Sequence, residues 1–199
     1  MIKKIKLPSK VVIASFNKGK VIEIKQLLKN SKSSFISISE FTEIAPKENG
    51  KAFNENALIK ARYANKISGL CSLADDSGLS VNALNGEPGI FSSRWAGKDN
   101  NFLQAIKSIE KKLKYEKDKS AYFTCALALV INSYKEYSFE GKIHGSLVFP
   151  SKGKNGFGYD PIFVPKGENF TFAQMNQDKK DSMSHRFEAY KKMKEVFFV

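Results

Sequence analysis

Alternating apolar and polar positions predict where the strands of this chain lie. Short runs rich in apolar and β-branched residues predict the first three strands, and two longer apolar or alternating segments predict an antiparallel pair. The predicted strands cover residues 11–15, 34–39, 71–74, 121–131 and 137–149. Between them, apolar residues three or four positions apart predict helices. The predicted helices cover residues 21–28, 51–67, 99–114 and 184–197.

This order of elements predicts an α/β protein. We expect a long mixed β-sheet flanked by helices, arranged as two lobes with a central cleft, and residues 1–199 as a single domain. The most regular helix carries Ala57, Ala61 and Ala64 on one side. Asn56 and Lys60 lie four positions apart and therefore share a face of that helix. Ligands usually bind in clefts between lobes, so we expect a site there.

Composition narrows the class of protein and its partners. The chain is 42% hydrophobic, and it has no apolar run of the roughly 18 residues that a membrane span needs. With no signal segment either, we expect a cytoplasmic protein that does not bind membranes. Its two cysteines, Cys71 and Cys125, suit buried free thiols better than a zinc or disulfide framework. The net charge of +13 favours a polyanionic partner, although a lysine-rich solvated surface explains much of it.

Two adjacent carboxylates form the first candidate site. Asp75 and Asp76 follow an apolar strand and precede Ser77 and Gly78. Neighbouring residues of a strand point to opposite faces, so the two acids are expected to do different jobs. Paired acids at a strand end can bind Mg²⁺ or activate a water molecule. The alternative is a simple turn, which Asp, Ser and Gly also favour.

A second candidate lies between the first strand and the first helix. A helix N-terminus attracts anions, and this segment adds side-chain donors and positive charge. It consists of Ser15, Phe16, Asn17, Lys18, Gly19 and Lys20. It lacks the Walker A spacing, and a capped helix start with solvent-exposed lysines is the alternative.

Three further groups complete the candidates. Glu48 could share a cation with Asp76, or it could be an ordinary solvent-exposed residue. The glycine-rich loop 153–160 holds aromatic residues that could stack on a base or anchor the loop in the core. The residues of this loop that could contact a base are Phe157, Gly158, Tyr159 and Asp160. Lys180, His185 and Arg186 could donate to an anion or a carbonyl-bearing base, or could belong to a helix start capped by Ser184.

Taken in order, these groups resemble the inosine/xanthosine triphosphate pyrophosphatase family. The resemblance extends over nearly the whole chain, from residue 11 to the last helix. The matching stretches are residues 15–20, 55–61, 74–81, 86–90, 93–97, 156–161 and 184–186. It implies a two-lobed mixed α/β fold, a homodimer and dependence on Mg²⁺. It also implies hydrolysis of ITP, dITP and XTP to the monophosphate and pyrophosphate.

The resemblance also assigns roles to residues. It implies that Asp76 binds the metal and acts as general base, with Glu48 and Asp75 as supporting metal carboxylates. It implies that the loop of residues 15–20, together with Lys60 and Ser77, holds the triphosphate. The residues implied around the purine are Phe157, Gly158, Tyr159, Asp160, Lys180, His185 and Arg186. Phe16 stands where the family usually has a small residue, so the range of substrates is open.

Two alternatives remain at this point. One is a related pyrophosphatase that acts on pyrimidine or modified nucleotides. The other is a basic nucleic-acid-binding protein without catalysis, which the charge of +13 would suit. The pyrophosphatase interpretation expects a purine nucleoside triphosphate as the substrate and no stable nucleic-acid partner.

Overall fold

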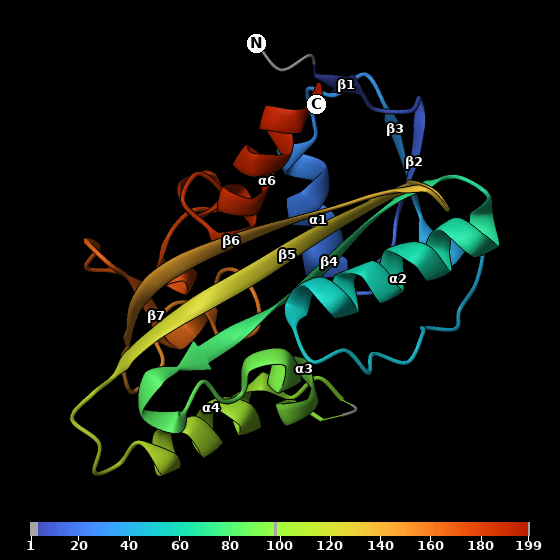
Figure 1. The fold of residues 1–199 in the computed structure, drawn as a ribbon. Helices are drawn as coiled ribbons and strands as arrows, with labels where there is room; N and C mark the ends of the chain where they lie inside the picture. Colours follow the sequence, from blue (N-terminus) through green and yellow to red (C-terminus); the bar gives the residue numbers. More distant parts are fainter. Residues whose placement is uncertain (1–3, 98, 199) are drawn as a thin grey trace. The chain divides into compact units, whose positions relative to one another are not determined.

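The computed structural model describes residues 4–97 and 99–198, which fold into helices around a mixed sheet (Figure 1). The strands are β1 (Ile5–Lys6), β2 (Lys10–Ile13), β3 (Ser34–Ser37), β4 (Cys71–Val81), β5 (Ser120–Asn132), β6 (Lys135–Leu147), β7 (Phe163–Pro165) and β8 (Phe197–Phe198). The helices are α1 (Lys18–Leu27), α2 (Phe53–Ser68), α3 (Ser92–Trp95), α4 (Phe102–Lys112), α5 (Gln177–Asp181) and α6 (His185–Val196).

The main sheet has the strand order β3-β2-β4-β5-β6-β7. β2 pairs in parallel with β3 and β4, whereas β6 and β7 are antiparallel. The sheet is therefore mixed, as the sequence predicts. β1 and β8, which the sequence analysis did not predict, form a separate two-stranded parallel sheet.

Most predicted elements are confirmed with shifts of a few residues at their ends. The clearest helix, predicted at 51–67, is α2, and Gly69 ends it in the left-handed region at φ 69°. The prediction that a strand ends before the two acids is wrong. β4 continues through Asp75 and Asp76 to Val81, so both carboxylates lie inside a strand. A predicted turn is thereby excluded at these positions.

The chain divides into two compact units. Unit 1 is drawn from the described residues of Met1–Asp76, Cys125–Gly141 and Arg186–Val199, and unit 2 from those of Ser77–Thr124 and Lys142–His185. The predicted central cleft stays a prediction. No helix within residues 4–97 and 99–198 has the length and hydropathy that a membrane span requires.

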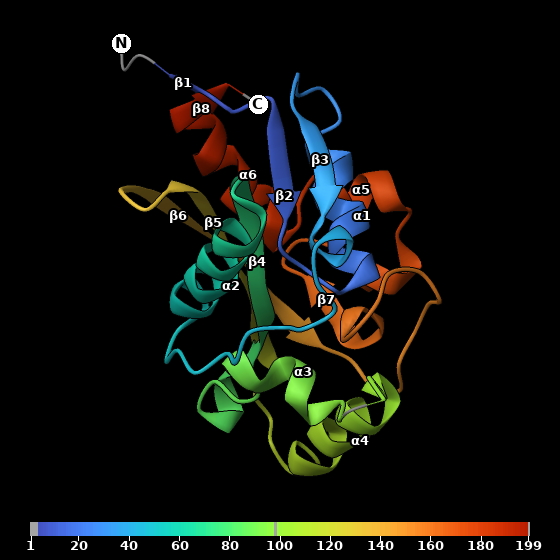
Figure 2. The same ribbon diagram turned by 90° about the vertical axis from the view of Figure 1, so that its right-hand side faces the viewer.

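In unit 1, strand alternation separates two apolar cores. Leu73 packs with α1 and α6 in one core, whereas its neighbour Ala74 packs with α2 in the other. Figures 1 and 2 show α2 on one side of β2 and β4 and α1 on the opposite side. Because α2 meets the sheet through Ala57, Ala61 and Ala64, its backbone can approach β4 closely. This packing brings polar side chains of α2 within reach of the strand.

In unit 2, α4 packs its apolar side against an aromatic core. Ala105, Ile106 and Ile109 of α4 are buried in the same core as Phe123 and Phe163. The Asn101 side chain caps the helix by accepting from the backbone N–H of Gln104. This core supports the glycine-rich loop described below.

Candidate active site

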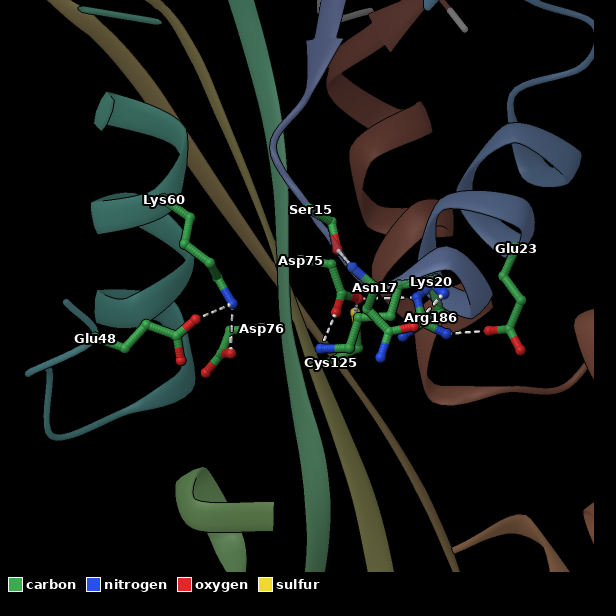
Figure 3. Close-up of polar contacts among 10 residues, drawn as sticks. All are labelled: Ser15, Asn17, Lys20, Glu23, Glu48, Lys60, Asp75, Asp76, Cys125 and Arg186. Atoms are coloured by element: carbon green, nitrogen blue, oxygen red, sulfur yellow. Dashed lines mark hydrogen bonds and ion pairs between the residues drawn. The ribbon is translucent and has the colours of Figure 1, made fainter. Parts of the chain in front are cut away.

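Strand β4 sends its two carboxylates to opposite sides. Asp75 points towards α1 and α6, and Asp76 points towards α2 (Figure 3). This follows from the period of two along a strand. The Asp75 side chain has no exposed area, and that of Asp76 is 9% exposed. The sequence prediction that the two carboxylates lie on opposite faces is confirmed, whereas their different jobs stay a prediction.

On the α2 side, one lysine joins two carboxylates. The Lys60 Nζ lies 2.7 Å from the Asp76 Oδ1 and 3.0 Å from the Glu48 Oε1. Burial alone would lower the pKa of Lys60, but the carboxylates of Asp76 and Glu48 raise it above its ordinary value. Burial raises the pKa of Asp76, against the opposing pull of the Lys60 and Lys20 ammonium groups. The structure therefore brings together Glu48, Lys60 and Asp76, as expected.

Helix α2 also holds the loop that carries Glu48. The backbone N–H of Gly50 donates to the Asn56 Oδ1 at 2.8 Å, and the N–H of Lys51 donates to the Glu55 Oε2 at 2.7 Å. A Cβ atom at Gly50 would lie 2.7 Å from the Asn56 Oδ1 and from the Glu55 Cβ. Glycine is thus required for this close approach, and the two side chains of α2 fix the path of the chain just after Glu48.

On the opposite side of β4, Asp75 is surrounded by donors. The Lys20 Nζ lies 2.7 Å from its Oδ1, while the Arg186 Nε and the Cys125 Sγ each lie 2.9 Å from its Oδ2. The Arg186 guanidinium also pairs with the buried Glu23 of α1. All five residues belong to unit 1, and Figure 3 shows them beside β4. Asp75 therefore anchors two cations.

The charges in this cluster stabilise one another. Burial alone would raise the pKa of Asp75, but Arg186 and Lys20 outweigh burial and hold that pKa well below its usual range. For Arg186, burial works in the opposite direction, and Asp75 and Glu23 raise its pKa. Burial and the adjacent Asp75 raise the pKa of Cys125, so its thiol stays protonated and can donate.

The start of α1 positions Lys20. Asn17 caps the helix, with its Oδ1 accepting from the backbone N–H of Lys20 at 3.1 Å. The Ser15 Oγ is buried and accepts from the N–H of Asn17 at 3.2 Å. Phe16 and Lys18 are exposed. The sequence analysis gave a capped helix start as the alternative for residues 15–20, and this cap is present. The same cap orients Lys20, which belongs to the candidate site.

Two predicted site residues are paired with buried charges, and their predicted roles stay predictions. Asp75, a predicted metal carboxylate, binds cations through both oxygens and lies on the far side of β4 from Asp76. Arg186, predicted at the purine, has a side chain that is 1% exposed and pairs with Asp75 and Glu23. Within residues 4–97 and 99–198, no cluster of three or more His, Cys, Asp or Glu residues could hold a metal.

A set of two carboxylates nevertheless fits Mg²⁺. The Asp76 Oδ2 is buried and has no hydrogen-bond partner among the described residues. Glu48 forms an ion pair with Lys60, the lysine that also binds Asp76. Mg²⁺ is usually held by one or two carboxylates together with water and substrate phosphates. Glu48 and Asp76 are therefore the residues that could hold it.

Unit 2 contains a separate polar cluster with aromatic neighbours. The Lys180 Nζ lies 2.5 Å from the Asp160 Oδ2, which also accepts from the backbone N–H of Phe157 at 2.9 Å. The ammonium lies 4.9 Å from the centre of the Phe157 ring. His185 stacks on Phe123 with ring centres 4.9 Å apart. The structure thus groups the predicted base-binding residues Phe157, Asp160 and Lys180.

Tyr159 does not share the polar contacts of this cluster. Its ring is 2% exposed, and its hydroxyl donates to the carbonyl of Ser92 at 2.9 Å. Gly158, at φ 68°, turns the loop between Phe157 and Tyr159. The alternative of a loop anchored in the core by an aromatic residue is therefore correct for Tyr159. Ser77, the first residue of unit 2, is half-buried.

The sequence analysis missed Glu23 and the contact that Cys125 makes with Asp75. Glu23 is not among the predicted site residues, yet it is 3% exposed. Its place one helical turn after Lys20, next to the buried Ile24, is the signal that could have identified it. Cys125 was correctly predicted as a buried thiol. It contacts Asp75, which is 50 positions away in the sequence, so no local pattern indicates the contact.

Comparisons with known proteins show the family of this chain. Residues 11–196 match the Ham1 family. The chain is 46% identical to the dITP/XTP pyrophosphatase of Caulobacter vibrioides over 192 residues, covering 96% of this chain and 98% of that protein. It is 42% identical to the dITP/XTP pyrophosphatase of Bacillus licheniformis, covering 92% of this chain and 95% of the relative.

A solved HAM1 protein from Coxiella burnetii matches with a TM-score of 0.87 and 39% identity, covering 95% of this chain and 98% of that one. The Ham1 protein of Staphylococcus aureus matches with a TM-score of 0.84 and 36% identity, covering 94% of this chain and 96% of that one. The mixed α/β fold is therefore that of the solved HAM1 proteins. The chain belongs to the Ham1 family.

Proposed function

We propose that this protein hydrolyses the non-standard purine nucleoside triphosphates ITP, dITP and XTP to the monophosphate and pyrophosphate. Relatives named dITP/XTP pyrophosphatase match almost the full length of the chain and support this activity. The observation that carries the proposal is the buried, unpartnered Oδ2 of Asp76 beside Lys60 and Glu48 among the described residues. This carboxylate has a free acceptor for a proton or a cation.

The chemistry follows from the charges of the site. A water oxygen forms a bond to the α-phosphorus while the bond from that phosphorus to the bridging oxygen breaks, and pyrophosphate leaves. Asp76 accepts the proton that the water loses. Lys60 and Lys20 bind phosphate oxygens and stabilise the negative charge that spreads over them in the transition state.

Mg²⁺ is proposed as the cofactor, held by Glu48 and Asp76. When bound, it neutralises phosphate charge and lowers the pKa of a bound water. Asp75 has a different part in this proposal, because it holds Lys20 through the 2.7 Å ion pair between its Oδ1 and the Lys20 Nζ. Hydrolysis of the triphosphate therefore depends on both acids for different reasons.

Base recognition is assigned to the unit 2 cluster. Phe157 can stack on a purine ring, and the imidazole of His185 can donate to the 6-oxygen of hypoxanthine or xanthine. Adenine carries an amino donor at that position, so the same contact would leave two donors facing each other, which a hydrogen-bonding site rejects strongly. Asp160 and Lys180 form the buried ion pair beside Phe157. A homodimer and a cytoplasmic location also belong to the proposal, on the resemblance to the family.

The test is a panel of nucleotides with pyrophosphate and orthophosphate measured separately. Purified protein is incubated with Mg²⁺ and with ITP, XTP, dITP, ATP, GTP or dTTP. We expect pyrophosphate from the first three and little from the rest, and none after chelation of the metal. Asp76→Asn should lower turnover by about 100-fold or more. Turnover of a different set of nucleotides would contradict the assignment of the unit 2 cluster to the purine base. If no nucleotide yields pyrophosphate, the nucleic-acid-binding alternative is favoured.

A further inference from the structure

The chain has two cysteines, and they lie in very different surroundings. Both are buried in the same apolar core of unit 1, Cys71 at 5% and Cys125 at 0% exposure. Cys71 begins β4, at the end of the strand that pairs with Val11 of β2. The Cys125 Sγ, in contrast, lies 2.9 Å from the Asp75 Oδ2. Only one of the two thiols therefore touches the candidate active site.

Three of the donors that hold the Asp75 carboxylate have different tasks. Its Oδ1 binds the Lys20 ammonium at 2.7 Å, and its Oδ2 accepts from the Arg186 Nε at 2.9 Å. The Cys125 thiol is the third donor and binds the same oxygen as Arg186. Two donors from different directions on Oδ2 restrict rotation of the carboxylate. The direction of Oδ1, and with it the position of the Lys20 ammonium, is thereby defined.

We propose that Cys125 is a positioning residue, whose thiol orients Asp75 and through it places the Lys20 ammonium for the triphosphate. The inference rests on the proposed function, because it assigns Lys20 to the phosphates. Cys125 itself does not contact substrate, because its side chain is wholly buried behind Asp75. A thiol is suited to the task because it donates one hydrogen bond and is otherwise a small apolar group that packs in a core.

The first experiment detects the hydrogen bond without using activity. Cys71→Ala leaves only the Cys125 thiol, and Cys125→Ala leaves only the Cys71 thiol. The S–H stretching band of each variant is recorded by infrared spectroscopy on the intact protein. We expect the Cys125 band at a clearly lower frequency than the Cys71 band, because donation to a carboxylate weakens the S–H bond. Bands at the same frequency would overturn the proposal, whatever the enzyme hydrolyses.

The second experiment follows the consequence for turnover. Removing one neutral hydrogen-bond donor should lower kcat by about 3- to 10-fold in Cys125→Ala. Cys125→Ser keeps a donor and should remain within about twofold of wild type. Cys71→Ala removes the same sulfur from the same core, so it controls for lost packing and should leave kcat unchanged. Melting temperatures of all three variants report whether they fold.

Dependence on Lys20 separates positioning from a general structural role. In a Lys20→Ala background, Cys125→Ala should lower kcat/KM by less than about twofold further, because coupled residues are not additive. An equal loss with and without Lys20, or equal losses in Cys71→Ala and Cys125→Ala, would contradict the proposal. If wild type hydrolyses no triphosphate, the proposed function fails, and the S–H bands still decide whether Cys125 holds Asp75.

Discussion

Asp75 and Asp76 are neighbours in β4, yet their carboxylates lie on opposite faces of the strand and bind different cations (Figure 3). Asp75 is enclosed by Lys20, Arg186 and Cys125, whereas Asp76 meets Lys60 and keeps one oxygen without a hydrogen bond among the described residues. One acid is thus built into the unit 1 core, and the other has an oxygen available for chemistry. Their substitutions are expected to have different effects.

Asp75→Asn should lower the free energy of unfolding by about 3 kcal/mol, because it removes one of the carboxylates that compensate the buried Arg186 and leaves Glu23 as a partner. Asp76→Asn should change it by less than about 1 kcal/mol, since Lys60 retains its contact with Glu48. Urea unfolding of both variants measures the difference. A similar loss in the two variants would show that the two faces of β4 are not energetically distinct.

Glu48→Gln should raise the Mg²⁺ concentration required for half-maximal turnover by about 10-fold or more, since it removes one of two proposed carboxylate ligands. Glu43→Gln is a matched control, because Glu43 precedes Glu48 in the same segment and is exposed. Titration of Mg²⁺ at saturating nucleotide measures the effect. Identical Mg²⁺ curves for both variants would remove Glu48 from the metal site.

Asn56→Ala should loosen the segment that follows Glu48, because the Gly50 N–H then loses its acceptor at 2.8 Å. We expect hydrogen exchange at the Gly50 amide to accelerate by about 10-fold, the equivalent of one lost hydrogen bond. Asn54→Ala, in the exposed first turn of the same helix, is the control. NMR of exchanging amides gives the rates. Unchanged exchange at Gly50 would mean that Asn56 does not fix this segment.

The pair of Arg62 and Glu136 joins α2 to β6 by hydrogen bonds from the Arg62 Nε and Nη2 to both carboxylate oxygens, at 2.6–3.1 Å. These bonds lower the pKa of Glu136, although partial burial opposes them. A lowered folded-state pKa stabilises the protein above the unfolded-state value near about 4.3, and this contribution is lost as the pH falls through the folded-state value.

Glu136→Gln should therefore lower the free energy of unfolding at pH 7 by up to about 1 kcal/mol, as for other exposed pairs. The difference from wild type should shrink steadily below about pH 4. Unfolding of wild type, Glu136→Gln, Arg62→Gln and the double variant at several pH values isolates the pair. If the coupling free energy between Arg62 and Glu136 does not change with pH, their interaction is not ionic.

The local pattern of the chain determined its helices, most of its strands and the opposite faces of Asp75 and Asp76. These features depend on spacing within one element, which neighbouring residues alone set. The same is true of Asn56 and Lys60, which share a face of α2 because they are four positions apart.

Only the tertiary structure decided which partners the acids have. Arg186 is 111 positions from Asp75, and α6 packs it into the unit 1 core against Asp75 and Glu23. Tyr159 was expected at the base but is buried with its hydroxyl on Ser92. A sequence can mark a residue as polar or aromatic. Whether that residue faces substrate or a buried charge depends on contacts between distant segments, which no local periodicity encodes.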